Sequence, residues 1–330
     1  RLDFSVNTNP LGLPERVRRV IKDSIDSTNI YPDPEKTLLH GSIAEHHGVR
    51  SANVLCGNGA SELFMAIVHA MRPKNILIPV PSFYGYEYVA KACGAFTEYY
   101  ERGSEYGLGE KFISVLSDDS RGWDMTFISC PNNPTGLMVP IPVLEHILDV
   151  CEEHDIYCVL DLCFLELTAE YEEYEKFLNE HEYPHLIKVY AFTKTYAMPG
   201  IRIGYIITEQ GVRDRIAQQI PEWNISMLAE KAGLACLEEQ QYLEESREFI
   251  RRERSWMKEN LKELSIESYE SHTNFLYVYT ESPIFDILFR ERILIRDCSN
   301  FRGAEEGYYR IALRRHDENK ELLKILKNNM

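Results

Sequence analysis

Basic residues are in short supply in this 330-residue chain, which carries 36 Lys and Arg against 52 Asp and Glu and a net charge of −16. Nucleic-acid binding depends on a basic surface, so we expect no nucleic-acid partner. No apolar run approaches the roughly 18 residues of a membrane span. The sequence does not begin with the basic stretch and following apolar stretch that are typical of a signal segment. We therefore expect a cytoplasmic protein without a membrane partner.

Metal-binding cysteine patterns are also missing. The eight cysteines are scattered, and none forms a Cys-x-x-Cys pair or another spacing typical of metal ligands. Several lie inside apolar runs, which is typical of buried free thiols in a reducing compartment. The sequence therefore predicts no metal site.

The chain is long enough to bury a sizeable core, and its hydrophobic fraction of 44% is ordinary for a globular protein. Strand-like and helical patterns alternate from about residue 50 to 207, which favours an α/β fold with a mostly parallel sheet between two helical layers. We expect a large three-layer domain over residues 31–225. Residues 1–30 and 226–330 are predicted to form a smaller α+β domain.

Two segments outside the alternating pattern are predicted to be exposed. Residues 1–12 contain Asn9-Pro10, which favours an extended conformation, and their composition indicates a surface arm. The acidic residues 169–181 are predicted to form a solvated helix, and a long, highly charged helical region is expected to end near residue 263.

Residues 186–207 are predicted to form a strand, a polar loop and a second strand. Lys194 lies in the loop between two threonines, and Arg202 follows it after a Pro-Gly pair. Such a lysine is either a surface residue or a reactive amine. We hypothesise that Lys194 forms a Schiff base and that Arg202 binds a phosphate.

A glycine turn, Gly57-Asn58-Gly59-Ala60-Ser61, separates a short buried strand from a predicted helix. The N-terminus of a helix offers free N–H groups and a positive dipole end, which suit a phosphate. The turn lacks the third glycine of a dinucleotide-binding fingerprint. An ordinary helix capped by Ser61 is the alternative.

Polar and aromatic residues follow the other predicted strands. Phe83 is followed by a second aromatic and is either a core residue or a platform for a flat ring; Asn133 lies in a dense turn cluster and could make an Asx-turn. Asp161 lies among apolar neighbours, where a carboxylate is costly unless it is paired. Ligands of parallel sheets bind beyond the carboxyl ends of the strands, where these three residues and Lys194 are all predicted to lie.

Taken in order, the motifs GNGAS, PSFYGYE, PNNPTG, the aspartate strand, TK and RIG resemble those of the pyridoxal-phosphate enzymes of fold type I, the aspartate-aminotransferase superfamily. The resemblance covers nearly the whole chain. It implies that Lys194 binds the cofactor covalently and moves the proton at the substrate Cα. It implies that Asp161 keeps the pyridine nitrogen protonated, that Asn133 bonds the ring hydroxyl oxygen, and that Phe83 stacks on the ring.

The same resemblance implies the remaining binding residues. The cofactor phosphate would be held by Gly59, Ala60, Ser61, Thr193 and Arg202. Arg310 would bind the substrate α-carboxylate through two parallel hydrogen bonds, with Asn7 nearby. Tyr31 would reach the cofactor phosphate of a neighbouring subunit, which implies a homodimer with shared active sites.

Within the superfamily, IRDCSNFRG and YYRIALR resemble most the L-threonine-O-3-phosphate decarboxylases of cobalamin synthesis, and next the histidinol-phosphate aminotransferases. This implies a small phosphorylated amino acid as substrate, bound with the help of Arg296, and a phosphate pocket shaped by residues 296–302. Decarboxylation is the expected reaction. Amino-group transfer to a 2-oxo acid is the alternative, and a non-catalytic module that binds a nucleotide or pyridoxal phosphate is the alternative of another class.

The sequence departs from the family pattern after Asp161. The family has Asp-Glu-Ala-Tyr or Asp-Glu-Ala-Phe, whereas this chain has leucine, Cys163 and Phe164 in the last three positions. Phe164 cannot donate a hydroxyl hydrogen bond to the ring oxygen, as transaminases commonly do, and this favours the decarboxylase branch. Cys163 takes the place of a small alanine against the ring and is compact enough to fit.

Overall fold

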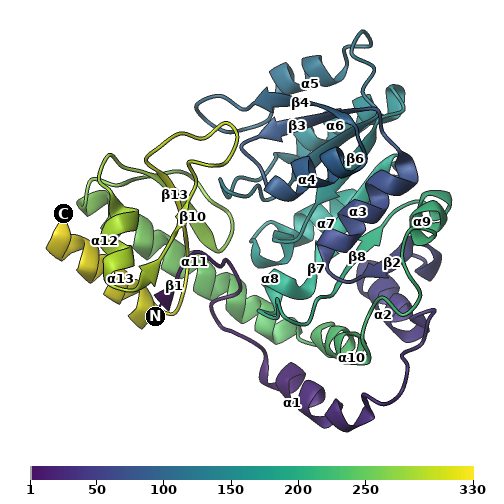
Figure 1. The fold of residues 1–330 in the computed structure, drawn as a ribbon, viewed down its shortest axis with the longest axis horizontal. Coiled ribbons are helices and arrows are strands. Elements are labelled where there is room, and N and C mark those ends of the chain that lie inside the picture. The colour runs from purple at the N-terminus through teal and green to yellow at the C-terminus, as the bar shows by residue number, and fades with distance from the viewer. Residues whose placement is uncertain (1) are drawn as a thin grey trace.

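The computed structural model describes residues 2–330, and a seven-stranded sheet forms its centre (Figure 1). The strand order is β2-β8-β7-β6-β5-β3-β4, and only the pairs made by β8 are antiparallel. The strands are β2 Val54–Gly57, β3 Asn75–Val80, β4 Phe96–Glu101, β5 Met125–Ser129, β6 Tyr157–Asp161, β7 Leu186–Ala191 and β8 Gly204–Ile207. The predicted mostly parallel sheet is confirmed.

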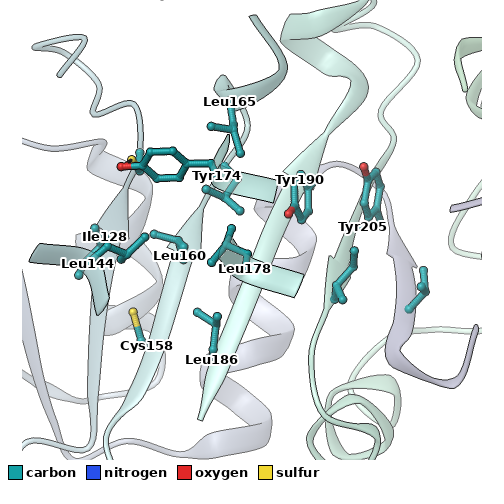
Figure 2. Packing of buried hydrophobic residues seen from close by; sticks show 14 of the residues in the cluster. Ile128, Leu144, Cys158, Leu160, Leu165, Tyr174, Leu178, Leu186, Tyr190 and Tyr205 are labelled. Atoms are coloured by element: carbon teal, nitrogen blue, oxygen red, sulfur yellow. Dashed lines mark hydrogen bonds between the residues drawn. The ribbon is translucent and has the colours of Figure 1, made fainter. Parts of the chain in front are cut away.

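Helices cover both faces of this sheet. One face packs against α3 (Ala60–Met71), α4 (Tyr84–Ala92) and α9 (Gln210–Ala217). The other packs against α2 (Thr37–His47), α5 (Glu110–Leu116), α6 (Ile141–Glu153) and α7 (Tyr171–Glu180). In Figure 2 side chains from β5, β6 and β7 meet those of α6 and α7 on this second face. The expected three-layer α/β arrangement is therefore confirmed.

A smaller antiparallel sheet, of order β12-β13-β10-β9, lies beside the large one (Figure 1). Its strands are β9 Glu267–Ser268, β10 Phe275–Tyr279, β12 Arg296–Asp297 and β13 Tyr308–Ala312, and a two-stranded pair joins β1 Leu2–Asp3 to β11 Ile293–Leu294. Its own hydrophobic core includes Phe4, Ile250 and Ile311. The helices outside the large sheet are α1 Glu15–Asp23, α10 Met227–Cys236, α11 Gln240–Glu263, α12 Ile284–Arg290 and α13 His316–Asn329.

The expectation of a surface arm at the N-terminus is wrong. Phe4, Asn7 and Asn9 are buried, and β1 pairs with β11. The Asn9 side chain donates to the carbonyl oxygen of Thr195 and to the hydroxyl of Ser246, 2.9 and 2.8 Å away. These hydrogen bonds satisfy the side-chain amide of Asn9 and allow this residue to be buried.

The expectation that residues 169–181 form a solvated helix is also wrong. The helix α7 buries Tyr174, Phe177 and Leu178, which recur at helical spacing between the acidic residues. Glu175 is buried too, and accepts hydrogen bonds from His47 and Tyr190 at 2.8 and 2.7 Å. The charged region before residue 263 forms two helices, α10 and α11, rather than one.

The prediction of buried free thiols is confirmed for most of the cysteines. All eight cysteines are free, and seven are buried. Residues 2–330 contain no cluster of His, Cys, Asp and Glu that could hold a metal ion. None of the described helices combines the length and apolarity that crossing a bilayer requires.

Candidate active site

A cavity of about 410 Å³ opens beyond the carboxyl ends of β5, β6 and β7. It brings together all the residues predicted from the sequence except Gly59 and Tyr31. They are Asn7, Ala60, Ser61, Phe83, Asn133, Asp161, Thr193, Lys194, Arg202, Arg296 and Arg310. The cavity therefore combines groups from the glycine turn, the large sheet, the N-terminal segment and the smaller sheet.

Lys194 lies in the short helix α8 (Phe192–Thr195), directly after β7. Its Nζ donates to Oδ1 of Asn7 at 2.9 Å, and the backbone N–H of Asn9 donates to its carbonyl oxygen at 2.9 Å. Burial, together with the positive charge of Arg310, lowers the pKa of Lys194 to about 8. The interpretation as a surface lysine is therefore wrong. A larger share of the amine is unprotonated near neutral pH, and that form is the nucleophile.

Asp161 ends β6 and is buried, with two hydrogen-bond donors at its carboxylate. The hydroxyl of Tyr86 donates to Oδ2 at 2.5 Å, and the backbone N–H of Cys163 donates to Oδ1 at 3.0 Å. Burial raises the pKa of Asp161, while these two donors and the charge of Lys194 act in the opposite direction. Tyr86 is not among the residues predicted from the sequence. Its position three residues after Phe83, on α4, could have indicated that it lies near the cavity.

The glycine turn forms a cradle suited to a phosphate. Helix α3 begins at Ala60, so Ser61 lies inside the first turn, and no side chain caps this end. The interpretation of Ser61 as a cap is therefore wrong, and the first N–H groups stay available. Gly59 has φ 78°, and a Cβ there would lie 2.3 Å from Nη2 of Arg202. Arg202 thus lies directly on the turn, where only glycine leaves room for it.

Arg310 joins three segments at the opposite side of the cavity. It is buried on β13, its Nη1 donates to Oδ1 of Asn133 at 2.5 Å, and its Nη2 donates to the carbonyl oxygen of Ser5 at 2.6 Å. Burial lowers its pKa to about 10. Its Nε has no hydrogen-bond partner within residues 2–330, which leaves one buried donor for a ligand.

Arg296 on β12 borders the cavity next to Phe301. Its guanidinium donates to Oδ1 of Asn300 and to the carbonyl oxygen of Asp297, both at 2.8 Å, and it lies 4.9 Å from the centroid of the Phe301 ring. Phe83 forms another part of the wall and is 37% exposed, so one face of its ring is open to a ligand.

Tyr31 lies away from the cavity, with 79% of its surface exposed and its ring 5.3 Å from that of Trp223. A contact with the cofactor of a neighbouring subunit stays a prediction.

The cavity is strongly positive within a negative protein. Lys194, Arg202, Arg296 and Arg310 bring four cationic groups, Asp161 brings one carboxylate, and the difference is three positive charges. Over residues 2–330, none of the four cations forms an ion pair with a carboxylate. Such a site favours ligands with several negative charges.

The model of the family described as aminotransferase class I and II matches residues 1–326. The chain belongs to this family. Class I and II aminotransferases depend on pyridoxal phosphate, and the cavity fits that group: a helix N-terminus, two hydroxyls and Arg202 for its phosphate, and a buried carboxylate for its ring nitrogen. When bound, the cofactor supplies an electron-accepting ring conjugated to the substrate amine.

Three relatives place the chain within the family. It is 31% identical over 334 residues to threonine-phosphate decarboxylase of Salmonella typhimurium, covering 99% of this chain and 90% of the relative. The structure of the histidinol-phosphate aminotransferase of Clostridium acetobutylicum is 32% identical, with a TM-score of 0.92 over the whole of both chains. The histidinol-phosphate aminotransferase of Sinorhizobium meliloti, solved in complex with pyridoxal-5'-phosphate, shares the fold at 20% identity, with a TM-score of 0.90 over 100% of this chain and 92% of that one.

Proposed function

We propose that this enzyme decarboxylates a small O-phosphorylated amino acid such as L-threonine O-3-phosphate. The observation that carries the proposal is that three arginines, Arg202, Arg296 and Arg310, line the cavity without a carboxylate partner among residues 2–330. Arg202 on the glycine turn faces the cofactor phosphate, and Arg310 faces the substrate α-carboxylate. Arg296 then remains for a second anionic group on the substrate, and the 31% identity to a threonine-phosphate decarboxylase supports a phosphate there.

Each side chain has a defined task in this proposal. Asp161, fixed by Tyr86, would hold the proton on the ring nitrogen, and Phe83 and Cys163, which both line the cavity, would contact the ring. Ser61 and Thr193 add hydroxyl donors to the phosphate cradle. Asn133 bonds the ring hydroxyl oxygen.

Decarboxylation breaks the bond between Cα and the carboxylate carbon, carbon dioxide leaves, and a proton takes the vacated position on Cα. Lys194 delivers this proton, because its amine lies in the cavity and has a pKa of about 8. Arg310 would hold the carboxylate of the substrate and so determine which bond at Cα is placed to break.

Amino-group transfer of the histidinol-phosphate type is the second candidate, supported by 32% identity to the Clostridium acetobutylicum aminotransferase. The two reactions part at Cα, where amino-group transfer breaks the bond to hydrogen and decarboxylation breaks the bond to the carboxylate carbon. Phe164 favours decarboxylation, since it cannot donate the hydroxyl hydrogen bond common in transaminases.

The test is to incubate the holoenzyme with L-threonine O-3-phosphate and to measure carbon dioxide, with unphosphorylated threonine as the matched control. We expect gas from the phosphorylated substrate and far less from threonine. If the amino group passes from histidinol phosphate or another amino donor to a 2-oxo acid, so that the ketone of the donor and a new amino acid form, and phosphothreonine yields no gas, the aminotransferase is supported and the proposal is refuted.

We propose further that the active unit is a homodimer in which Tyr31 completes the neighbouring site. Exposed apolar side chains suit a contact with a second copy: Ile30 and Trp223 line a surface pocket with Tyr31, and Ile25 and Leu38 are exposed in the same stretch of chain. A Lys194→Ala chain and a Tyr31→Ala chain, each inactive or weak alone, should regain activity when refolded together, because one site of the mixed dimer is intact. No recovery would contradict shared sites.

A further inference from the structure

A second cavity, of about 600 Å³, adjoins the active-site cavity, and the two share Phe83, Tyr84, Arg296 and Phe301. One wall of the second cavity comes from strands β3 and β4 of the large sheet and from helix α4, which packs on that sheet. The facing wall comes from residues 299–302, which follow β12. We call residues 298–303 the Arg302 segment, because Arg302 makes the main contact between this segment and the wall formed by β3, β4 and α4.

Arg302 contacts one residue of strand β4, Tyr99, and one residue of helix α4, Glu87. Its guanidinium lies over the ring of Tyr99, 3.9 Å from the centroid, and donates to the carboxylate of Glu87 at 3.3 and 3.5 Å. Partial burial raises the pKa of Glu87, but donors from Lys91 and Arg302 outweigh it and hold that pKa below its ordinary value. The carboxylate is therefore charged at neutral pH and attracts Arg302.

A close backbone approach fixes the same segment at its other end. Gly303 has φ 77°, and a Cβ there would lie 3.2 Å from Cγ2 of Val80 and 3.3 Å from the backbone N of Pro81. Val80 ends β3, and Pro81 follows it and leads to Phe83. The Arg302 segment is thus in contact with the strand end that carries a wall of the active site.

The segment in turn sets the orientation of Arg296. Asn300 accepts a hydrogen bond from Nη2 of Arg296 at 2.8 Å, and the Phe301 ring lies beneath the guanidinium. Arg296 has no carboxylate partner among the residues that the structure describes, so these two neighbours, with the carbonyl oxygen of Asp297, hold it in place. Movement of the segment would move the charge that faces the substrate.

We propose that the Arg302–Glu87 ion pair, with the Tyr99 ring, holds the Arg302 segment against α4 and so positions Arg296 for the distal anionic group of the substrate. Arg302 is thus a positioning residue, and it acts on specificity through Arg296. The identity of the anionic group rests on the proposed function, whereas the positioning rests on the contacts alone.

The opposite arrangement, in which Arg302 itself binds the substrate, makes a different prediction for Glu87. If Glu87 serves to hold the segment, Glu87→Gln loosens Arg296 and raises KM. If Glu87 merely competes with the substrate for Arg302, the same change frees the arginine and lowers KM. The direction of the Glu87→Gln effect therefore separates the two roles.

The experiment compares holoenzymes carrying Arg302→Gln, Glu87→Gln and both changes. Exposed ion pairs and cation–π contacts are modest, so each single change should raise KM for phosphothreonine about tenfold with kcat unchanged. The double variant should match the single ones, because both changes remove one interaction. Arg302→Lys, which keeps the charge, should recover part of the loss. Lys91→Gln is the matched control: Lys91 also pairs with Glu87 but does not contact the segment, so KM should not change.

Amide hydrogen exchange of residues 297–303 gives a readout independent of turnover. We expect faster exchange in Arg302→Gln and in Glu87→Gln, and wild-type exchange in Lys91→Gln. Unchanged exchange in the first two variants, a lower KM in Glu87→Gln, or multiplied effects in the double variant would each overturn the positioning role. Failure of the wild-type enzyme to release carbon dioxide would refute the proposed function instead, and exchange would still decide the role of Arg302.

Discussion

Replacing Tyr86 by phenylalanine tests how the structure holds the carboxylate of Asp161. The change removes one hydroxyl and leaves the ring, which stacks on Phe127 with centroids 5.0 Å apart, so the core keeps its packing. Asp161 loses the 2.5 Å hydrogen bond to Oδ2 and keeps only the backbone donor at Oδ1. A hydrogen bond to a charged group contributes about 1.5–3 kcal/mol. If the whole free energy of this hydrogen bond stabilises the transition state, its loss lowers kcat by about 10- to 150-fold.

The pH dependence gives a second, signed readout of the same change. The Tyr86 hydroxyl lowers the pKa of Asp161 against the effect of burial. Without it this pKa rises further, so the acidic limb of the kcat profile should move to higher pH.

Tyr190→Phe is the matched control for both measurements. Tyr190 is an equally buried tyrosine that donates to a buried carboxylate, Glu175, at 2.7 Å, but it lies outside the cavity. We expect its kcat to equal that of the wild type. Wild-type kcat and an unmoved pH profile in Tyr86→Phe would refute the reasoning about Asp161.

Three further predictions follow from buried or unpaired charges. The pKa of Lys194 is lowered to about 8 in the folded, cofactor-free chain, so between about pH 8 and 10.5 the unfolded chain holds a proton that the folded chain has released. The free energy of unfolding should therefore rise with pH through that window. Urea unfolding should show this rise in the wild type and not in Lys194→Met. His47→Ala removes one of the two side chains that bond the buried carboxylate of Glu175, leaving Tyr190, and should lower the free energy of unfolding by about 1–3 kcal/mol. Arg296→Gln should raise KM for phosphothreonine while leaving the weak turnover of threonine unchanged, and an equal effect on both substrates would contradict its assignment to the phosphate.

Much of the cavity could be predicted from the sequence because parallel strands deliver their carboxyl ends to one edge of the sheet. Phe83, Asn133, Asp161 and Lys194 each follow a recognisable strand, and the edge brings them together without knowledge of any side-chain contact.

Contacts between distant segments could not be predicted in this way. Asn7 accepts from Lys194 across 187 residues of sequence, and Arg310 donates to Asn133 across 177. No periodicity in the sequence encodes such pairs, since they depend on how the N-terminal segment and β13 pack against the large sheet. The N-terminal segment also lacks an apolar pattern, because its burial rests on one core side chain, Phe4, and on the hydrogen bonds of Asn7 and Asn9.

The most direct test of the proposed function is a mass balance with L-threonine O-3-phosphate labelled in the carboxylate, in the absence of any 2-oxo acid. Decarboxylation predicts one labelled carbon dioxide for each aminoalkyl phosphate formed, over many turnovers. Label that stays in the substrate would contradict decarboxylation. Label that appears in a keto acid once an amino acceptor is added would also assign the enzyme to amino-group transfer.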